Sequence, residues 1–245
     1  SLFAANRCRS AVVNIDNPYG LRLAKQIDIK TYETSADAIE IKDESFTGSS
    51  IIWRDLEIEL RVSGRFNIEN ALLAASTCLL LGIDEIQVVN GLEAAEPVPG
   101  RFEVIDGYKG APTVIVDYSH TPAGIENILQ AVRKISPEVG LTIVFGCGGN
   151  RDDNKRPKMA RAAEIHADRV IVTSDNPRYE DPRKIIDQTM SGFIDPNPVI
   201  VEEDRERAIQ LAIQSSDAGG VIVIAGKGAE TTQEVCGKVE PFDDR

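Results

Sequence analysis

The chain has 245 residues, 42% of them apolar, which is enough to bury the core of one large domain or of two smaller ones. Its formal net charge of −12, from 27 Lys and Arg against 39 Asp and Glu, disfavours binding to nucleic acid or to an anionic membrane surface. The apolar runs are far shorter than the roughly 20 residues of a membrane-spanning helix, so we expect a globular, cytoplasmic protein without membrane insertion.

The first hundred residues predict short strands followed by two helices. A strand-like segment, AVVNI, opens the region, and KTYETS, AIEIKDESF, SSIIW and DLEIELRV follow with the period of two that is typical of antiparallel strands. NIENALLAASTCLLLGI predicts a buried helix with Asn67 as its N-cap and Gly82 at its end. DEIQVVNGLEAA predicts a second helix.

A domain boundary is predicted at EPVPG, residues 96–100, because two prolines and a glycine interrupt the helical pattern there. We therefore expect one domain over residues 1–97 and another over residues 98–245.

Beyond this boundary, strands and helices alternate. The expected strands are FEVID, PTVIVDY, LTIVFG, RVIVTS, PVIVEE and VIVIAG, and the expected helices begin near Pro122, Pro157, Pro182 and Arg205. Nearly continuous Val and Ile in the strands, with helices between them, indicate an α/β fold with a mostly parallel sheet covered by helices on both faces.

Ligands of such sheets bind beyond the carboxyl ends of the strands. The polar and glycine-rich segments of this sequence follow directly after predicted strands. They are Asp117 to His120, Gly146 to Asp153, Asp175 to Arg178, and Gly226 to Glu230. We expect these four loops to open on one edge of the sheet, which we call the rim.

Two of the loops resemble phosphate-binding motifs but lack a required residue. GCGGNRDDNKRP has Arg151 where the dinucleotide pattern G-x-G-x-x-G needs glycine, and AGKGAETT has Gly228 where the P-loop pattern needs Ser or Thr. Four dispersed cysteines and two histidines give no metal-binding spacing, so we expect no structural zinc site.

The segment DNPR admits two interpretations. Asp, Asn and Pro are ordinary choices for the loop between a strand and a helix, so it can simply be a capped loop. Alternatively, the planar guanidinium of Arg178 matches a carboxylate in two hydrogen bonds. With Arg151 and Glu230 on neighbouring loops, the rim would then offer cations for carboxylates and an acid for an ammonium group, which suits an amino acid.

His120 also admits two interpretations. It can stabilise the turn between a strand and a helix, or it can act with Asp117 in binding a hydroxyl group or a nucleotide. His166 has no such neighbour, and we interpret it as a residue at the C-terminal end of a helix.

Four stretches together resemble the Mur ligases of peptidoglycan synthesis. They are GRFNIENALLAA, GRFEVIDG with VDYSHTP, GCGGNRDDNKRP with TSDNPRYEDP, and AGKGAETTQ. The resemblance covers nearly the whole chain. It implies the latter part of the family's central ATPase domain, followed by most of its C-terminal domain, which has a Rossmann-like and mostly parallel sheet.

The resemblance implies an ATP-dependent amide-forming ligase. ATP would phosphorylate the γ-carboxylate of D-glutamate in UDP-MurNAc-L-Ala-D-Glu, and the amino group of the third residue would attack the acyl phosphate. Magnesium would bridge the phosphates. In this family, the form with DNPR selects meso-diaminopimelate, whereas lysine-adding relatives vary at the arginine.

The resemblance also assigns site residues. For diaminopimelate they are Arg151, Asp175, Asn176, Arg178, Gly226 and Glu230. For the nucleotide they are Asn67 and Asn70 near adenine, Asp117 at the ribose, and Arg101 and His120. All five nucleotide residues are expected at the interface between the domains. No catalytic residue and no metal ligand is assigned within this chain.

The sequence departs from the family pattern in two motifs and in extent. Ala229 stands where the family has His in GKGHE, and Ser119 stands where it has Ala in DYAHTP. The UDP-sugar domain, the phosphate loop GTNGKT and the modified lysine that holds magnesium would lie before Ser1, so we expect no turnover by this chain alone. A ligase that adds lysine or another amino acid, a folate-type glutamate ligase and a non-catalytic binding module remain alternatives.

Overall fold

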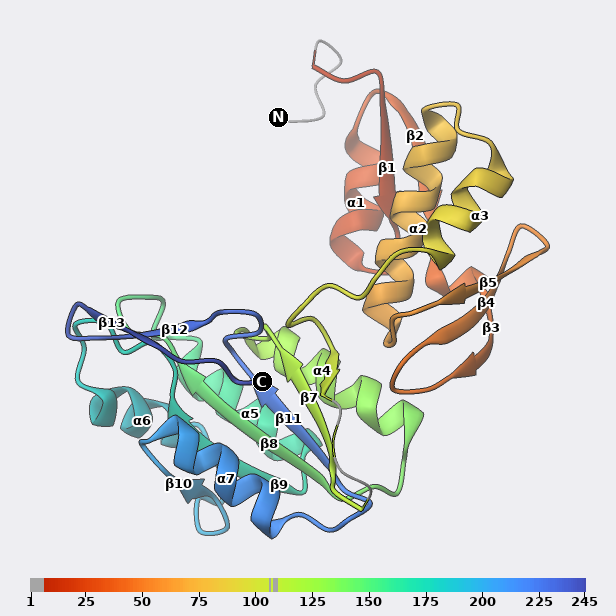
Figure 1. Ribbon diagram of the computed structural model, residues 1–245. Coiled ribbons are helices and arrows are strands. Elements are labelled where there is room, and N and C mark those ends of the chain that lie inside the picture. Colours follow the sequence, from red (N-terminus) through yellow and green to blue (C-terminus); the bar gives the residue numbers. More distant parts are fainter. Residues whose placement is uncertain (1–6, 106, 108–109) are drawn as a thin grey trace. The chain divides into compact units, whose positions relative to one another are not determined.

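The computed structural model describes residues 7–105, 107 and 110–245 (Figure 1). The chain separates into two compact units, Ser1–Glu96 and Pro97–Arg245, which we call unit 1 and unit 2. The division falls within EPVPG, whose prolines cannot continue a helix. No helix in the described ranges is long and apolar enough to span a bilayer.

Unit 1 combines a parallel strand pair, an antiparallel sheet and three helices. Its elements are β1 (Ser10–Asn14), α1 (Pro18–Gln26), β2 (Lys30–Thr34), β3 (Glu40–Glu44), β4 (Ser49–Trp53), β5 (Leu56–Leu60), α2 (Arg65–Leu80) and α3 (Glu85–Glu93). The antiparallel sheet β3–β4–β5 confirms the prediction for these strands. The expectation was wrong for KTYETS, because β2 pairs in parallel with β1. Helix α1 lies between these two strands, and such a crossover permits parallel pairing.

The first turn of α2 corrects the predicted cap. The helix begins at Arg65 with Gly64 as its N-cap, so Asn67 already lies inside the first turn. Its side-chain Nδ2 donates to the carbonyl of Ser63 at 2.8 Å. As an N-cap, its side-chain oxygen would instead accept a hydrogen bond from a backbone N–H of the first turn. Ile51, Ile58 and other apolar residues of β4, β5, α2 and α3 form the core of this unit.

Unit 2 is a six-stranded sheet with helices on both faces (Figure 1). Its elements are β6 (Glu103–Ile105), β7 (Thr113–Asp117), α4 (Pro122–Ile135), β8 (Leu141–Cys147), α5 (Arg156–His166), β9 (Arg169–Ser174), α6 (Pro182–Met190), β10 (Ile200–Val201), α7 (Arg205–Ser215), β11 (Val221–Ala225), β12 (Thr232–Val235) and β13 (Lys238–Pro241). The strand order is β10-β9-β8-β11-β7-β6, and only β6 is antiparallel to its neighbour. The alternation of strands and helices therefore confirms the predicted fold class.

The helices of unit 2 cover the sheet unequally. Helices α4, α5 and α6 pack side by side on one face, and α7 packs on β8, β9 and β11 from the other (Figure 1). Strands β8 and β11 are completely buried between them. Asp181 caps α6 and Asp204 caps α7 through their side-chain oxygens, which fixes where each helix leaves the rim.

Candidate functional site

The rim gathers the four loops that the sequence singles out. Strands β7, β8, β9 and β11 run parallel to one another, in register over most of their lengths. Their carboxyl ends therefore lie at the same edge of the sheet. The hairpin β12–β13 follows the last of these loops, and a bridge between Arg178 and Val235 joins it to the loop after β9.

Asn176 occupies the centre of a polar network at this rim. It is buried, and its Nδ2 donates to Oε2 of Glu230 at 2.9 Å. Its Oδ1 accepts from the backbone N–H of Glu234 at 2.9 Å and lies 3.4 Å from Nζ of Lys227. Because every polar atom of its amide has a partner, Asn176 fixes Glu230 in one orientation.

Glu230 has one oxygen engaged and one open. Its Oε2 accepts from Asn176 and also lies 3.3 Å from the ammonium of Lys227, a fully buried side chain whose third contact is the Thr232 carbonyl. Within the described residues, Oε1 has no hydrogen-bond partner. The Glu230 side chain is 39% exposed, so Oε1 can accept from a cationic ligand.

Arg178 is held in an unusual backbone conformation. Its φ is +54°, in the left-handed region, and its backbone is fixed by hydrogen bonds from its N–H to Glu234 O and from Cys236 N to its carbonyl. Its Nη1 donates to the carbonyl of Gly149 at 2.8 Å, and Nε lies 3.6 Å from Glu234 Oε2. Within the described residues, Nη2 makes no hydrogen bond. This nitrogen is the one available to a carboxylate.

Close backbone packing joins the loop after β8 to the loop after β9. Gly149 N donates to Asn176 O at 2.9 Å, and a Cβ atom on Gly149 would overlap the carbonyl oxygen of Pro177. On the loop after β11, Gly226 has φ of +123°, and a Cβ there would lie 2.6 Å from Oδ2 of Asp175. Glycine is required at position 149 because the backbone of Pro177 leaves no room for a side chain. It is required at position 226 because both the positive φ and the nearby Asp175 carboxylate exclude one.

Arg151 lies near Arg178 on the loop after β8. It is exposed, and a Cβ built on Gly148 would lie 3.8 Å from Arg151 Cγ and 3.1 Å from Arg178 Nη1. Side-chain atoms of both arginines therefore lie close to Gly148. Asp175 is buried, and its Oδ1 accepts from the N–H of Asn176. The structure thus brings all six residues predicted for the amino acid onto three adjoining loops.

The predicted nucleotide residues of unit 2 gather around Tyr118. The guanidinium of Arg101 stacks on the Tyr118 ring at 4.5 Å, and the His120 ring meets the same ring edge-on at 4.7 Å. Asp117 is buried, and it accepts from Phe102 N and from Ser119 N, each at 2.8 Å. Its carboxylate therefore ties the strand end to the turn that precedes β6.

The other two predicted nucleotide residues lie on α2 of unit 1. The side chain of Asn67 is engaged with Ser63, as described above, whereas Asn70 is exposed. The nucleotide assignment stays a prediction for all five residues.

Three buried cations of unit 2 were not predicted. Arg156 binds both carboxylate oxygens of Glu180, Arg205 binds both oxygens of Asp244, and Lys227 lies in the network of Asn176. The ion pair with Arg156 and a backbone bond from Asn150 hold the pKa of Glu180 below its ordinary value. In the sequence each of these cations is an ordinary charged residue near a helix or strand end, so no local signal marks it as buried.

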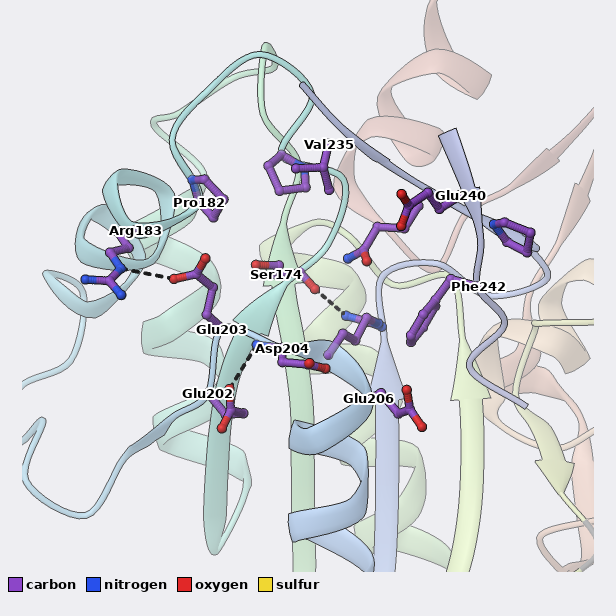
Figure 2. Close-up of a pocket in the computed structure, with 14 residues that line it drawn as sticks. Ser174, Pro182, Arg183, Glu202, Glu203, Asp204, Glu206, Val235, Glu240 and Phe242 are labelled. Carbon is purple, nitrogen blue, oxygen red and sulfur yellow. Dashed lines mark hydrogen bonds and ion pairs between the residues drawn. The ribbon is translucent and has the colours of Figure 1, made fainter. Parts of the chain in front are cut away.

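A separate polar cavity of about 580 Å³ lies between α6, the start of α7 and the hairpin (Figure 2). Glu202, Glu203, Asp204 and Glu206 line one side of it, and Arg183 binds Glu203 at its edge. None of the six residues predicted for the amino acid lines this cavity. Within the described ranges, no group of three or more His, Cys, Asp or Glu residues could hold a metal ion.

Two family profiles match the chain. The profile described as "Mur ligase, glutamate ligase domain" matches residues 100–228, and the profile described as "Mur ligase middle domain" matches residues 1–78. The first alone covers more than half of the chain.

Individual relatives agree with these profiles. The chain is 38% identical over 261 residues to a protein of Xanthomonas campestris pv. campestris and 39% identical over 250 residues to one of Aquifex aeolicus. Both are named UDP-N-acetylmuramoyl-L-alanyl-D-glutamate--2,6-diaminopimelate ligase, and each match covers 99% of this chain. A solved structure of the same name matches with a TM-score of 0.60 and 32% identity, over 99% of this chain and 53% of that one. The chain spans about half the length of the relatives, 52% and 51% respectively.

Proposed function

Because this chain belongs to the Mur ligase family, we propose that it is the amino-acid-binding part of a ligase of the MurE type. The complete protein would join meso-diaminopimelate to UDP-MurNAc-L-Ala-D-Glu in the cytoplasm, with ATP and Mg²⁺. ATP would supply the phosphoryl group that turns the γ-carboxylate of D-glutamate into an acyl phosphate. The described residues offer no magnesium site of their own, so we assign no step of the reaction to a metal held by this chain.

The amino-acid subsite follows from the open donors and acceptors at the rim. Glu230 Oε1 would accept from an ammonium group, next to the backbone of Gly226. Arg178 Nη2 would donate to a carboxylate, and the exposed Arg151, whose side chain also approaches Gly148, would offer a second cation. Asn176 and Asp175 would hold the subsite in shape from beneath, because both are buried and hydrogen-bonded.

This arrangement favours diaminopimelate over lysine on physical grounds. The two amino acids differ by one carboxylate, so lysine would leave Arg178 Nη2 without the hydrogen bond that this carboxylate would accept. Losing a hydrogen bond to a charged group costs about 1.5–3 kcal/mol, which is roughly a ten- to hundredfold change in affinity. Sites built to bind a polar group reject analogues that lack it, because the groups of the site are then left unpaired.

The nucleotide would bind at the cluster around Tyr118. Arg101 presents a cation already stacked on an aromatic ring, and His120 is exposed beside it. Asp117 accepts two backbone hydrogen bonds and one from Ser119 Oγ, and a carboxylate has about four acceptor positions, so one would remain for a ribose hydroxyl if the ligand reaches this buried group.

A single observation carries the proposal. Asn176 orients Glu230. Arg178, which lies two residues after Asn176, is anchored by the carbonyl of Gly149. An acceptor for an ammonium group and a donor for a carboxylate are thus held by one short loop. A zwitterionic ligand with an additional carboxylate fits these two charges.

The test is calorimetric titration of this chain with meso-diaminopimelate and with L-lysine. We expect tighter binding of meso-diaminopimelate, and we expect Arg178→Ala to remove most of that preference. Arg183→Ala is the matched control, since Arg183 lies five residues later, is exposed and pairs only with Glu203. Equal or tighter binding of L-lysine by the unmodified chain would refute the assignment to diaminopimelate and favour a lysine-adding ligase.

Ligation itself is tested in the complete protein. Phosphate release from ATP should require both UDP-MurNAc-L-Ala-D-Glu and meso-diaminopimelate. Binding of the amino acid without any such release would favour a non-catalytic module with the same fold.

A further inference from the structure

Arg156 and Glu180 form an ion pair beneath the two loops that carry Arg151 and Arg178. Arg156 is the first residue of α5, and Glu180 lies two residues after Arg178. Nη1 and Nη2 of Arg156 each lie 3.0 Å from a different carboxylate oxygen of Glu180. The arginine side chain is 1% exposed and the glutamate 22%, so solvent screens this two-pronged pair only weakly.

Both partners also hold the loop after β8 directly. Arg156 Nη2 donates to the carbonyl of Gly148 at 3.2 Å, and the N–H of Asn150 donates to Glu180 Oε1. In the opposite direction, Tyr179 N donates to Asn150 Oδ1 at 3.1 Å. Together with the bond from Gly149 N to Asn176 O, residues 149 and 150 are each bonded directly to the loop after β9, and residue 148 is linked to it through Arg156 and Glu180.

The direction of the Arg178 side chain depends on this fixation. Its Nη1 donates to the carbonyl of Gly149, which lies between the two residues that Arg156 and Glu180 hold. A shift of residues 148–150 would therefore move the anchor of Arg178 and the attachment of Arg151 at the same time. Glu180 also pairs with Arg156, so this buried guanidinium is not available to a ligand carboxylate.

From these contacts we infer that Arg156 and Glu180 are a positioning pair for amino-acid selection, which holds in place the loop segment that anchors Arg178 and leads into Arg151. The identity of the amino acid rests on the proposed function. Neither member of the pair touches the ligand. Glu180 acts through Asn150, and Arg156 acts through Gly148, on the two arginines that do.

The test compares Glu180→Gln with the matched control Glu203→Gln in this chain. Glu203 also pairs with an arginine, Arg183 at 3.2 Å, but that pair is exposed and lies away from the loop after β8. The first measurement is amide hydrogen exchange without ligand. We expect exchange of the Gly149 and Asn150 amides to become at least tenfold faster in Glu180→Gln and to stay unchanged in the control.

The second measurement is the ratio of affinities for meso-diaminopimelate and L-lysine. We expect Glu180→Gln to weaken binding of meso-diaminopimelate about tenfold and to leave L-lysine binding within about twofold, so the ratio falls. A merely structural role would weaken both ligands equally. An unchanged ratio in Glu180→Gln would overturn the inference even if the unmodified chain prefers meso-diaminopimelate.

The two proposals fail separately. If the unmodified chain does not distinguish the two amino acids, the proposed function fails, and exchange at Gly149 and Asn150 still decides whether the pair holds the loop. If Glu180→Gln does not fold, Arg156→Lys replaces it, because a lysine ammonium keeps the charge but cannot bind both oxygens of Glu180 and the Gly148 carbonyl together. We then expect a smaller loss in the same ratio, about threefold, and no loss would overturn the inference.

Discussion

Arg205 and Asp244 form a fully buried ion pair that joins the first turn of α7 to the end of the described chain. Nε and Nη2 of Arg205 each lie 2.7 Å from a carboxylate oxygen of Asp244. The guanidinium also donates to the carbonyls of Ser174 and Ala225, the last residues of β9 and β11. Burial lowers the pKa of Arg205, but the hydrogen bonds to Asp244 and the charge of Asp244 raise this pKa by a larger amount, so the net shift is upward. The pair therefore fixes the two strand ends that lead into the proposed amino-acid loops.

Asp244→Asn should destabilise unit 2 strongly. It leaves a buried guanidinium without its counter-charge, and breaking one side of a buried pair typically costs about 3–5 kcal/mol. Replacing both residues, in Arg205→Met with Asp244→Leu, should cost much less because no charge is left buried. Urea unfolding followed by far-UV circular dichroism measures both variants. Trp53, the only tryptophan, is buried in unit 1, so its fluorescence serves as an internal control. A loss below about 1 kcal/mol for Asp244→Asn would contradict the prediction.

Most of the strands and helices of unit 2 were predictable because each of them carries a local signal. Strands such as β8 and β11 are buried on both faces and read as continuous apolar runs, and Pro122 and Pro182 mark the helix starts. Elements without apolar faces were missed. Helix α1 has no buried residue, and the hairpin β12–β13 is mostly exposed, so neither contains a run of apolar residues that marks a buried element.

The candidate site was predictable only to the level of its loops. The rule for parallel sheets placed Arg178 and Glu230 at one rim, since it depends on strand direction alone. The partner of each charge depends on long-range packing. Arg178 is anchored on Gly149, which is 29 residues away in sequence. Arg156 is buried beside Glu180, which is 24 residues away. Contacts over such separations leave no local signal in the sequence.

Gly149→Ala should separate the two loops of the site. The new Cβ would meet the backbone carbonyl of Pro177, which cannot turn away as a side chain would, so we expect a loss of about 1–3 kcal/mol in stability. Gly140→Ala is the control, because nothing lies within 4 Å of a Cβ there and the change should be neutral or slightly stabilising. Denaturant titration of both variants checks the contrast, and similar midpoints would argue against the close packing at Gly149.

The stabilising effect of Glu180 should depend on pH in a defined direction. The ion pair with Arg156 and the hydrogen bond from Asn150 lower the pKa of Glu180 in the folded protein below its ordinary 4.5. A carboxyl group with a lowered folded pKa stabilises the fold fully above its unfolded pKa, and this contribution disappears as the pH falls through the folded pKa. The stability difference between the unmodified chain and Glu180→Gln should therefore be constant near pH 7 and shrink below about pH 4.5. Urea midpoints between pH 7 and pH 3 measure it, and a difference that does not change with pH would exclude this origin.

Asn176→Asp should lower the stability of the fold and weaken ligand binding, and both losses should be smaller at acidic pH. The substitution keeps the shape of the side chain but replaces the donor to Glu230 with a second carboxylate, 2.9 Å from the first. Two carboxylates in a buried site repel each other, so one of them takes up a proton and has a raised pKa. For an acid with a raised folded pKa, the penalty is absent below the unfolded pKa and complete above the folded one. We expect a loss of roughly 2–4 kcal/mol at pH 7, partly offset by Lys227, and a smaller loss near pH 4.

The control for this prediction is Asn197→Asp. Asn197 also donates its side-chain N–H to a carboxylate, Oδ1 of Asp195 at 2.8 Å, but both residues are exposed. Water and salt screen charges there, so the same chemical change should cost less than about 1 kcal/mol at any pH. If Asn176→Asp and Asn197→Asp lose the same stability at pH 7, the network around Asn176 is open to solvent, and Glu230 then has no fixed orientation with which to bind an ammonium group.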